Sequence, residues 1–138
     1  MGEKKVILDT NILISALGWE GKPKEILQKG IAGEFILILP KRQVEELQIV
    51  LAYPRLKFTE SQRIRFLDIL FEIGTIVETQ DKLKMIAHDI YDNALLEAAI
   101  KNNISFIVSG DSDLLRVKQV EATKLTTAAQ FLELFKLE

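Results

Sequence analysis

The fold is decided by residues 6–17, which read VILDTNILISAL. Residues 6–8 form a continuous apolar run, and residues 9–11 form a polar cluster of the kind that caps helices. The apolar side chains that follow, over residues 12–17, recur in a pattern that a buried helix can use. This segment therefore predicts a buried strand, a turn and a buried helix, with Asp9 directly at the end of the strand.

The rest of the chain continues this alternation of apolar runs and helical patterns. Further buried strands are expected at residues 35–39, 75–77 and 104–108, and helices around 26–27 and over 40–51, 59–73, 89–100 and 128–135. Apolar strands that are separated by helices imply a parallel sheet covered on both faces. The expected fold is a three-layer α/β/α sandwich with a central, mainly parallel sheet, built by one domain over residues 1–138.

Length and composition restrict the class of protein. A chain of 138 residues with 48% hydrophobic content can bury a core as one domain. The chain has no cysteine, which excludes disulfides and thiolate chemistry, and its one histidine, His88, argues against a histidine-rich zinc site. The apolar run before Asp9 is too short to be a signal peptide or to span a membrane, so a cytoplasmic protein is expected. Net charge is −2, so any nucleic-acid binding must be local.

Two aspartates, Asp9 and Asp111, follow predicted buried strands. In open parallel sheets, ligands gather outside the carboxyl ends of the strands. An ionised carboxylate at such a place is unfavourable unless a cation, hydrogen bonds or water compensate its burial. Each aspartate also has a purely structural explanation, because Asp9 can cap the following helix and Asp111 can form an Asx turn.

Two further acidic residues, Glu46 and Asp92, lie in predicted helices. Glu46, like its neighbour Glu45, can be an ordinary solvated position, and Asp92 fits the third position of a helix capped by Asp89. Four acidic residues from separate segments can also converge at one edge of the sheet, where their repulsion requires a cation. Clusters of carboxylates alone suit Mg²⁺ or Mn²⁺, ions that activate water and neutralise charge on a phosphodiester under attack.

At these positions the chain resembles the PIN domain family, especially the VapC-like ribonuclease toxins. Residues 6–17 resemble the opening strand and helix of that family, which implies that Asp9 binds a metal and that Asn11 has a supporting polar role. Glu46 matches the helical glutamate of the family, and Asp92 matches the acidic residue that opens its central helix. The resemblance covers nearly the whole chain.

The segment IVSGDSDLL, residues 107–115, is similar to the strand-end motif of the family, in which a hydroxyl residue and a spacer precede two aspartates one apart. This implies that Asp111 is a metal ligand, that Asp113 is a second or outer ligand and that Ser109 hydrogen-bonds the cluster. Close relatives often carry arginine, aspartate and proline before the central acidic residue, whereas this chain departs from that pattern at His88 and Asp89. His88 is open to interpretation as a phosphate contact, a general acid or a structural residue.

The resemblance implies a metal-dependent endoribonuclease that uses Mg²⁺ or Mn²⁺ and leaves a 5′-phosphate and a 3′-hydroxyl. It further implies a toxin of a toxin–antitoxin pair, held inactive by a small antitoxin protein, and assembly into a dimer or a larger oligomer. One alternative is an aspartyl-phosphate enzyme, but its familiar form needs a second aspartate where this chain has Asn11. Another is an inert PIN-like module that binds RNA or protein; the presence of all four acidic positions favours an active enzyme.

Several surface features remain open from the sequence. Lys41 and Arg42 begin the helix that carries Glu46, where a bound phosphate would relieve their conflict with the helix dipole, although ordinary solvation explains them too. Residues that can border an RNA track are Arg55, Lys57, Arg63, Arg65, Arg116 and Lys118. Candidate contact surfaces, which core packing also explains, are Trp19 and the helix face of Ile64, Phe66, Leu67 and Leu70. Glu97 is expected to pair with Lys101 on a helix surface.

Overall fold

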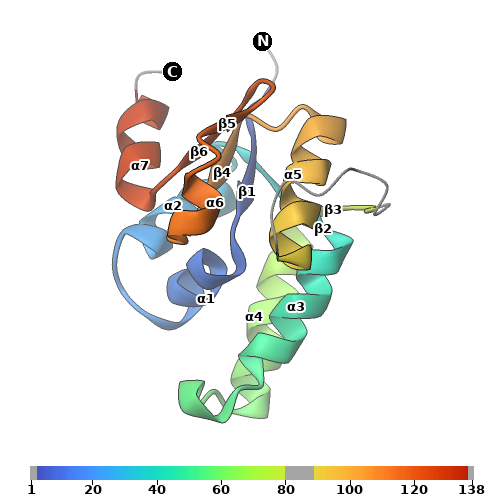
Figure 1. Ribbon diagram of the computed structural model, residues 1–138. Coiled ribbons are helices and arrows are strands. Elements are labelled where there is room, and N and C mark those ends of the chain that lie inside the picture. Colours follow the sequence, from blue (N-terminus) through green and yellow to red (C-terminus); the bar gives the residue numbers. More distant parts are fainter. Residues whose placement is uncertain (1–2, 80–88, 137–138) are drawn as a thin grey trace.

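The computed structural model describes residues 3–79 and 89–136, and within them a six-stranded sheet forms the centre of the molecule (Figure 1). Its order is β3-β2-β1-β4-β6-β5, and all neighbours are parallel except β5 and β6. The strands are β1 (Lys5–Leu8), β2 (Ile36–Pro40), β3 (Gly74–Val77), β4 (Phe106–Val108), β5 (Gln119–Val120) and β6 (Thr123–Thr126). The mainly parallel sheet that the sequence predicts is confirmed.

Helices cover both faces of this sheet, so the predicted three-layer sandwich is confirmed as well. They are α1 (Thr10–Gly18), α2 (Lys22–Ile31), α3 (Lys41–Leu51), the 3₁₀ helix η1 (Pro54–Leu56), α4 (Glu60–Ile73), α5 (Ile90–Asn102), α6 (Ser112–Leu115) and α7 (Ala128–Lys136). One apolar cluster joins the sheet to α1, α2, α3, α4 and α7, and a second joins the opposite face to α5 and α6. In Figure 1, α2 and α7 lie on one side of the sheet and α5 lies on the other.

Strand β1 is central because its side chains are buried on both faces. Val6 and Leu8 belong to the first apolar cluster, Ile7 belongs to the second, and all three are 0% exposed. On its two edges β1 pairs with β2 and β4, so its backbone hydrogen bonds are also satisfied within the sheet. A strand buried in this way must be apolar throughout, which is the pattern that residues 6–8 show.

The capping signals in the sequence correctly locate the starts of two helices. Thr59 and Gln62 form a reciprocal capping box at the start of α4. At the start of α5, the Asp89 side chain accepts hydrogen bonds from the N–H groups of Tyr91 (2.8 Å) and Asp92 (3.1 Å). The cap that we expect from Asp89 is therefore confirmed, and Asp92 occupies the third position of the helix.

The sequence does not reveal the hairpin of β5 and β6 or the short helix α6. The turns around this hairpin use Lys118 and Glu121 in the left-handed region, with φ of 64° and 50°, where glycine or asparagine would have signalled a turn. Strand β6 also carries polar side chains that point into the protein. Thr123 tolerates burial because its hydroxyl donates to the carbonyl of Ile104 at 2.6 Å. Tertiary pairing, rather than local pattern, makes these strands.

The apolar face that the sequence predicts on α4 is only partly covered. Leu70 is fully buried and Phe66 and Leu67 pack against the core, but Ile64 is 53% exposed and Phe71 is 42% exposed. On α5, Glu97 pairs with Lys101 at 3.5 Å as expected, yet its side chain is 3% exposed, so the expectation of a surface pair is wrong. Of the helices that the structure describes, none has the length and apolar character needed to cross a membrane.

The junction between α4 and β3 yields a stability prediction. A Cβ atom added at Gly74 would lie 2.5 Å from Leu39 Cδ1 and 2.8 Å from the carbonyl oxygen of Leu70, which is backbone and cannot easily move. We expect Gly74→Ala to lower the free energy of unfolding by about 1–3 kcal/mol, measured by urea denaturation. Gly110→Ala is the matched control, because no atom lies within 4 Å of its added Cβ. Equal stability of the two variants would contradict this account of the junction.

Candidate active site

The centre of the candidate site is the edge where β1 and β4 end side by side. Leu8 is in register with Val108, and the N–H of Asp9 donates to the carbonyl of Val108 at 2.9 Å. This pairing brings Asp9 next to Ser109, whose Oγ donates to Asp9 Oδ2 at 2.6 Å. The same Ser109 Oγ accepts from the N–H of Asp111 at 3.0 Å. Two segments 100 residues apart are thus joined through one fully buried hydroxyl.

Asp9 stands at the N-cap position of α1, but its side chain makes no capping hydrogen bond. Asp9 is 7% exposed, and its carboxylate is bound by Ser109 instead. The purely structural explanation, in which Asp9 is an ordinary helix cap, is therefore wrong. Asp111 differs, because its Oδ1 accepts from the N–H of Asp113 at 2.9 Å and so does cap α6, as the Asx-turn alternative proposes.

Glu46 reaches this edge from α3. Its Oε1 accepts a hydrogen bond from the hydroxyl of Thr10, the residue after Asp9. Glu46 is half-buried whereas Glu45 is exposed, so the solvated alternative fits Glu45 and not Glu46. The buried Gln43 donates to the carbonyl of Leu8 and fixes the first turn of α3 against the end of β1.

Sequence reasoning missed Thr10 and Gln43. A signal for Gln43 was present, because Gln43, Leu47 and Leu51 are spaced by four residues and lie on one buried face of α3. A polar side chain on such a face needs a partner in the core, and here the partner is the backbone of β1. No comparable signal marks Thr10.

Asp92 is held near the same edge by α5. Burial, as the largest cause, and the negative charges of Asp9, Asp89, Asp111 and Glu46 together raise the pKa of Asp92 to about 7. Since these effects act through space, the other three predicted acidic residues lie within electrostatic range of Asp92. Asp89, which the sequence identifies only as a cap, is a fifth member of what we call the carboxylate group (Asp9, Glu46, Asp89, Asp92 and Asp111).

The pKa values of Asp9 and Glu46 are also raised. Burial is the main cause for both; hydrogen bonds from Ser109 and the Thr10 N–H oppose it at Asp9, and the Thr10 hydroxyl opposes it at Glu46. Neighbouring carboxylates add to the upward shift in each case. Full ionisation of the group is therefore unfavourable without a compensating cation. A donor set of carboxylate oxygens fits a hard divalent ion such as Mg²⁺ or Mn²⁺.

The structure does not draw every predicted site residue into this group. Asp113 is exposed, and its Oδ1 lies 3.3 Å from Nη1 of Arg116. Asn11 is exposed on α1, and His88 lies outside the described residues. Over residues 3–79 and 89–136, no three acidic or histidine side chains stand close enough to hold a metal ion. The ligand roles therefore stay predictions.

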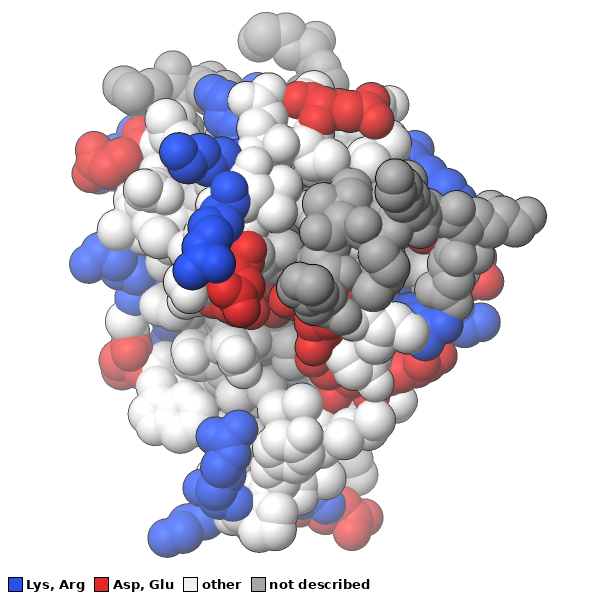
Figure 2. All heavy atoms as spheres, in the orientation of Figure 1, with Lys and Arg blue, Asp and Glu red and all other residues white. Residues whose placement is uncertain are grey.

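Two of the basic residues that the sequence suggests as phosphate or RNA contacts have partners within the protein. Lys41 lies 3.7 Å from Glu78, and Arg63 donates to the carbonyl of Phe58 at 2.9 Å. Figure 2 shows acidic side chains gathered near the middle of one face, with a separate group of basic side chains toward the lower end of the molecule. On the face that Figure 2 shows, basic side chains lie directly beside the acidic centre as well as toward the lower end.

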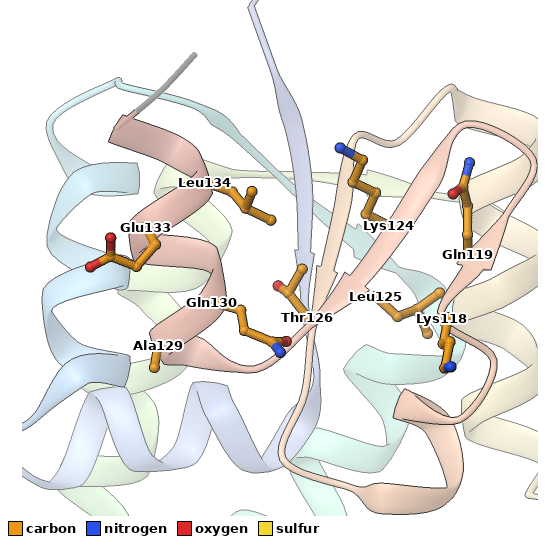
Figure 3. Close-up of a pocket in the computed structure, with 9 residues that line it drawn as sticks. All are labelled: Lys118, Gln119, Lys124, Leu125, Thr126, Ala129, Gln130, Glu133 and Leu134. Carbon is orange, nitrogen blue, oxygen red and sulfur yellow. The ribbon is translucent and has the colours of Figure 1, made fainter.

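A cavity of about 590 Å³ lies away from the carboxylate group, between α7 and the β5–β6 hairpin (Figure 3). Its walls include Leu125, Thr126 and Leu134, with Lys118 and Lys124 among its polar residues. None of the acidic residues of the carboxylate group lines it. Size alone therefore does not mark the chemical site in this fold.

The chain is similar to known proteins in its sequence family and in its fold. A family model described as PIN domain matches residues 5–113. Among curated proteins, no sequence matches significantly.

Three solved structures share the fold at low sequence identity. VapBC2 from Rickettsia felis, bound to a DNA fragment from its promoter, is 19% identical with a TM-score of 0.60, over 88% of this chain and 96% of that chain. PAE2754 from Pyrobaculum aerophilum is 14% identical with a TM-score of 0.67, over 99% and 91%. The PIN domain endonuclease Utp24 is 15% identical with a TM-score of 0.53, over 89% and 84%.

The raised pKa of Asp92 predicts how stability depends on pH in the metal-free protein. Between its ordinary value of 3.8 and about 7, the folded state binds a proton that the unfolded state does not, so stability falls as pH rises through this window. We expect thermal melts in chelator to show this decline, and a shallower one for Asp92→Asn. The exposed Asp68→Asn on α4 serves as control and keeps the wild-type slope. Identical slopes for wild type and Asp92→Asn would refute the assignment.

Proposed function

This chain belongs to the PIN domain family, and from that premise we propose that it is a metal-dependent endoribonuclease that hydrolyses RNA phosphodiester bonds. The observation that carries the proposal is that Asp9, Glu46 and Asp111 all lie within electrostatic range of Asp92 near the carboxyl edge of the sheet. In this group Asp9 is buried without acting as a cap. Packing alone gives no reason to gather four carboxylates at one place.

We assign metal binding to Asp9, Glu46, Asp92 and Asp111, with Asp113 as a second or outer ligand and with Asn11 and Ser109 in support. Bound there, Mg²⁺ or Mn²⁺ would supply an activated water and charge neutralisation for in-line attack on the phosphodiester, leaving a 5′-phosphate and a 3′-hydroxyl. The choice between the two ions rests on oxygen-donor chemistry alone, which both satisfy.

The residues of the chain prepare this site by fixing its carboxylates. The Ser109 hydroxyl holds one oxygen of Asp9, and the Thr10 hydroxyl holds one oxygen of Glu46. Such hydrogen bonds around the carboxylates set the orientation of a metal site. Asp92 is the member whose protonation changes near neutral pH, and a nearby cation favours its ionised form.

We further propose that the nuclease acts as the toxin of a toxin–antitoxin pair in the cytoplasm and that its partners include a small antitoxin protein and a second copy of the chain. The fold that this chain shares with VapBC2 supports the first partner. The exposed Ile64 and Phe71 on α4 offer an apolar surface for a protein partner.

The activity prediction uses single carboxylate replacements. With Mn²⁺, we expect the purified protein to cut a diverse pool of transcripts, and we expect Asp9→Asn and Asp111→Asn to cut at least about 100-fold more slowly, since each loses a charged ligand. Removal of the metal with chelator stops cleavage. Asp68→Asn, an exposed position on α4, keeps the wild-type rate. Cleavage by Asp9→Asn at the wild-type rate would point to a contaminating nuclease.

The metal prediction is tested without RNA. We expect calorimetric titration of Mn²⁺ near pH 7 to show binding to the wild type and to Asp68→Asn, and loss of binding in Asp111→Asn. Because the pKa of Asp92 is about 7, binding also releases protons, which appears as a dependence of the measured heat on the ionisation enthalpy of the buffer. A wild-type protein that binds no Mn²⁺ would support an inert RNA- or protein-binding module instead.

A further inference from the structure

A cleft of about 320 Å³ opens beside the carboxylate group, between α1 and the end of α3. It is lined by Asn11, Ile14, Ser15, Trp19, Val50, Arg55 and Leu56. Asn11 directly follows Thr10, whose hydroxyl binds Glu46, and Val50 lies one helical turn beyond Glu46 on α3. The cleft therefore begins next to two carboxylates of the group and leads away from them along α1 and α3.

Trp19, at the end of α1, is held in place and yet open to solvent. Its ring lies 5.6 Å from that of Phe58, and Phe58 in turn lies edge-on to Phe66 at 5.1 Å. Gly18 allows this packing, because a Cβ atom there would stand 2.8 Å from the Phe58 ring. Trp19 is nevertheless 50% exposed. A large aromatic ring supported from one side and exposed on the rest is a platform on which a planar group can stack.

Arg55 brings a positive charge to the same cleft. It belongs to η1, which begins at Pro54, and its guanidinium carbon lies 5.4 Å from the centre of the Tyr53 ring. Among the residues placed by the structure, no acidic side chain pairs with Arg55. Its charge is therefore available to an anion, which matters in a chain whose net charge is −2.

We propose that this cleft binds one nucleotide of single-stranded RNA next to the phosphate that is cut, with the base stacked on Trp19 and a backbone phosphate held by Arg55. Stacking on an exposed aromatic ring beside a cation is how proteins hold unpaired nucleotides. Asn11 and Ser15 offer hydrogen bonds to the edge of the base, and the volume lies at the small end of ligand pockets. The inference rests on the proposed function and names the form of its substrate.

The chain provides its own reporter for this cleft, because Trp19 is its one tryptophan. A short single-stranded RNA is titrated into the wild-type protein in chelator, so that no cleavage occurs, and tryptophan emission is followed. We expect saturable quenching. A duplex of the same sequence leaves the emission unchanged, because its bases are already stacked and cannot reach the indole. No change with the single strand, or equal quenching by the duplex, overturns the proposal.

Two variants separate stacking from charge. With a labelled single strand, we expect Trp19→Ala and Arg55→Gln each to bind about tenfold more weakly than the wild type. Arg55→Gln also lowers the salt dependence by about 0.7 in the slope of log affinity against log salt, which is the share of one phosphate contact on a single strand, and Trp19→Ala keeps the wild-type slope. Matched controls are Phe71→Ala and Lys136→Gln, which change an exposed aromatic of α4 and an exposed cation of α7. Affinity losses in the controls equal to those in the cleft variants overturn the proposal.

The outcomes for the cleft and for the nuclease are distinguishable. If the wild type cuts RNA with Mn²⁺ and Trp19→Ala cuts and binds equally well, the nuclease stands and the cleft is not a nucleotide site. If the single strand quenches Trp19 in chelator and no metal supports cleavage, the cleft binds RNA and the proposed activity fails. Urea denaturation of each variant shows whether lost binding comes from lost folding.

Discussion

The hydrogen bond from Ser109 to Asp9 joins the end of β1 to the end of β4, and the rest of the site is arranged around it. Asp9 is nearly buried, and a buried carboxylate needs partners that favour its charged form. Ser109 is one such partner, and the same oxygen accepts from the N–H of Asp111, which places that residue beside the strand ends. Thr10 extends the arrangement to Glu46, so that α1 and α3 are positioned together.

This arrangement costs stability in the metal-free protein. Burial and mutual repulsion raise the pKa values of Asp9, Glu46 and Asp92, so each is harder to ionise than an exposed carboxyl group. The fold compensates with two complete apolar layers, in which β1 contributes side chains to both faces. Unfavourable charge concentrated at one place, within a fold that is otherwise well packed, is typical of functional sites.

Three aspartates of this region show whether the role of a residue follows from its neighbours in the sequence or from its tertiary contacts. At Asp89 the local explanation holds, because its side chain does cap α5, and yet its charge also acts on the carboxylate group. At Asp9 the local explanation fails: the N-cap position is occupied, but the carboxylate binds Ser109. Asp113 differs from both. It belongs to the strand-end motif of the family, and yet in this structure its side chain is exposed and lies beside Arg116.

The sequence by itself determined the order of these strands and helices along the chain and the parallel sheet, because continuous apolar runs, helical spacing and caps are local signals; it also predicted the acidic residues of the candidate site. It could not determine the β5–β6 hairpin, whose turns use lysine and glutamate at positive φ, nor the buried position of Glu97. The anchors Thr10 and Gln43 and the cleft of Trp19 and Arg55 were also decided only by tertiary structure. The reason is physical: these features depend on which segments meet across the sheet and on how deeply each side chain is buried there, and neither is fixed by a residue's neighbours in the chain.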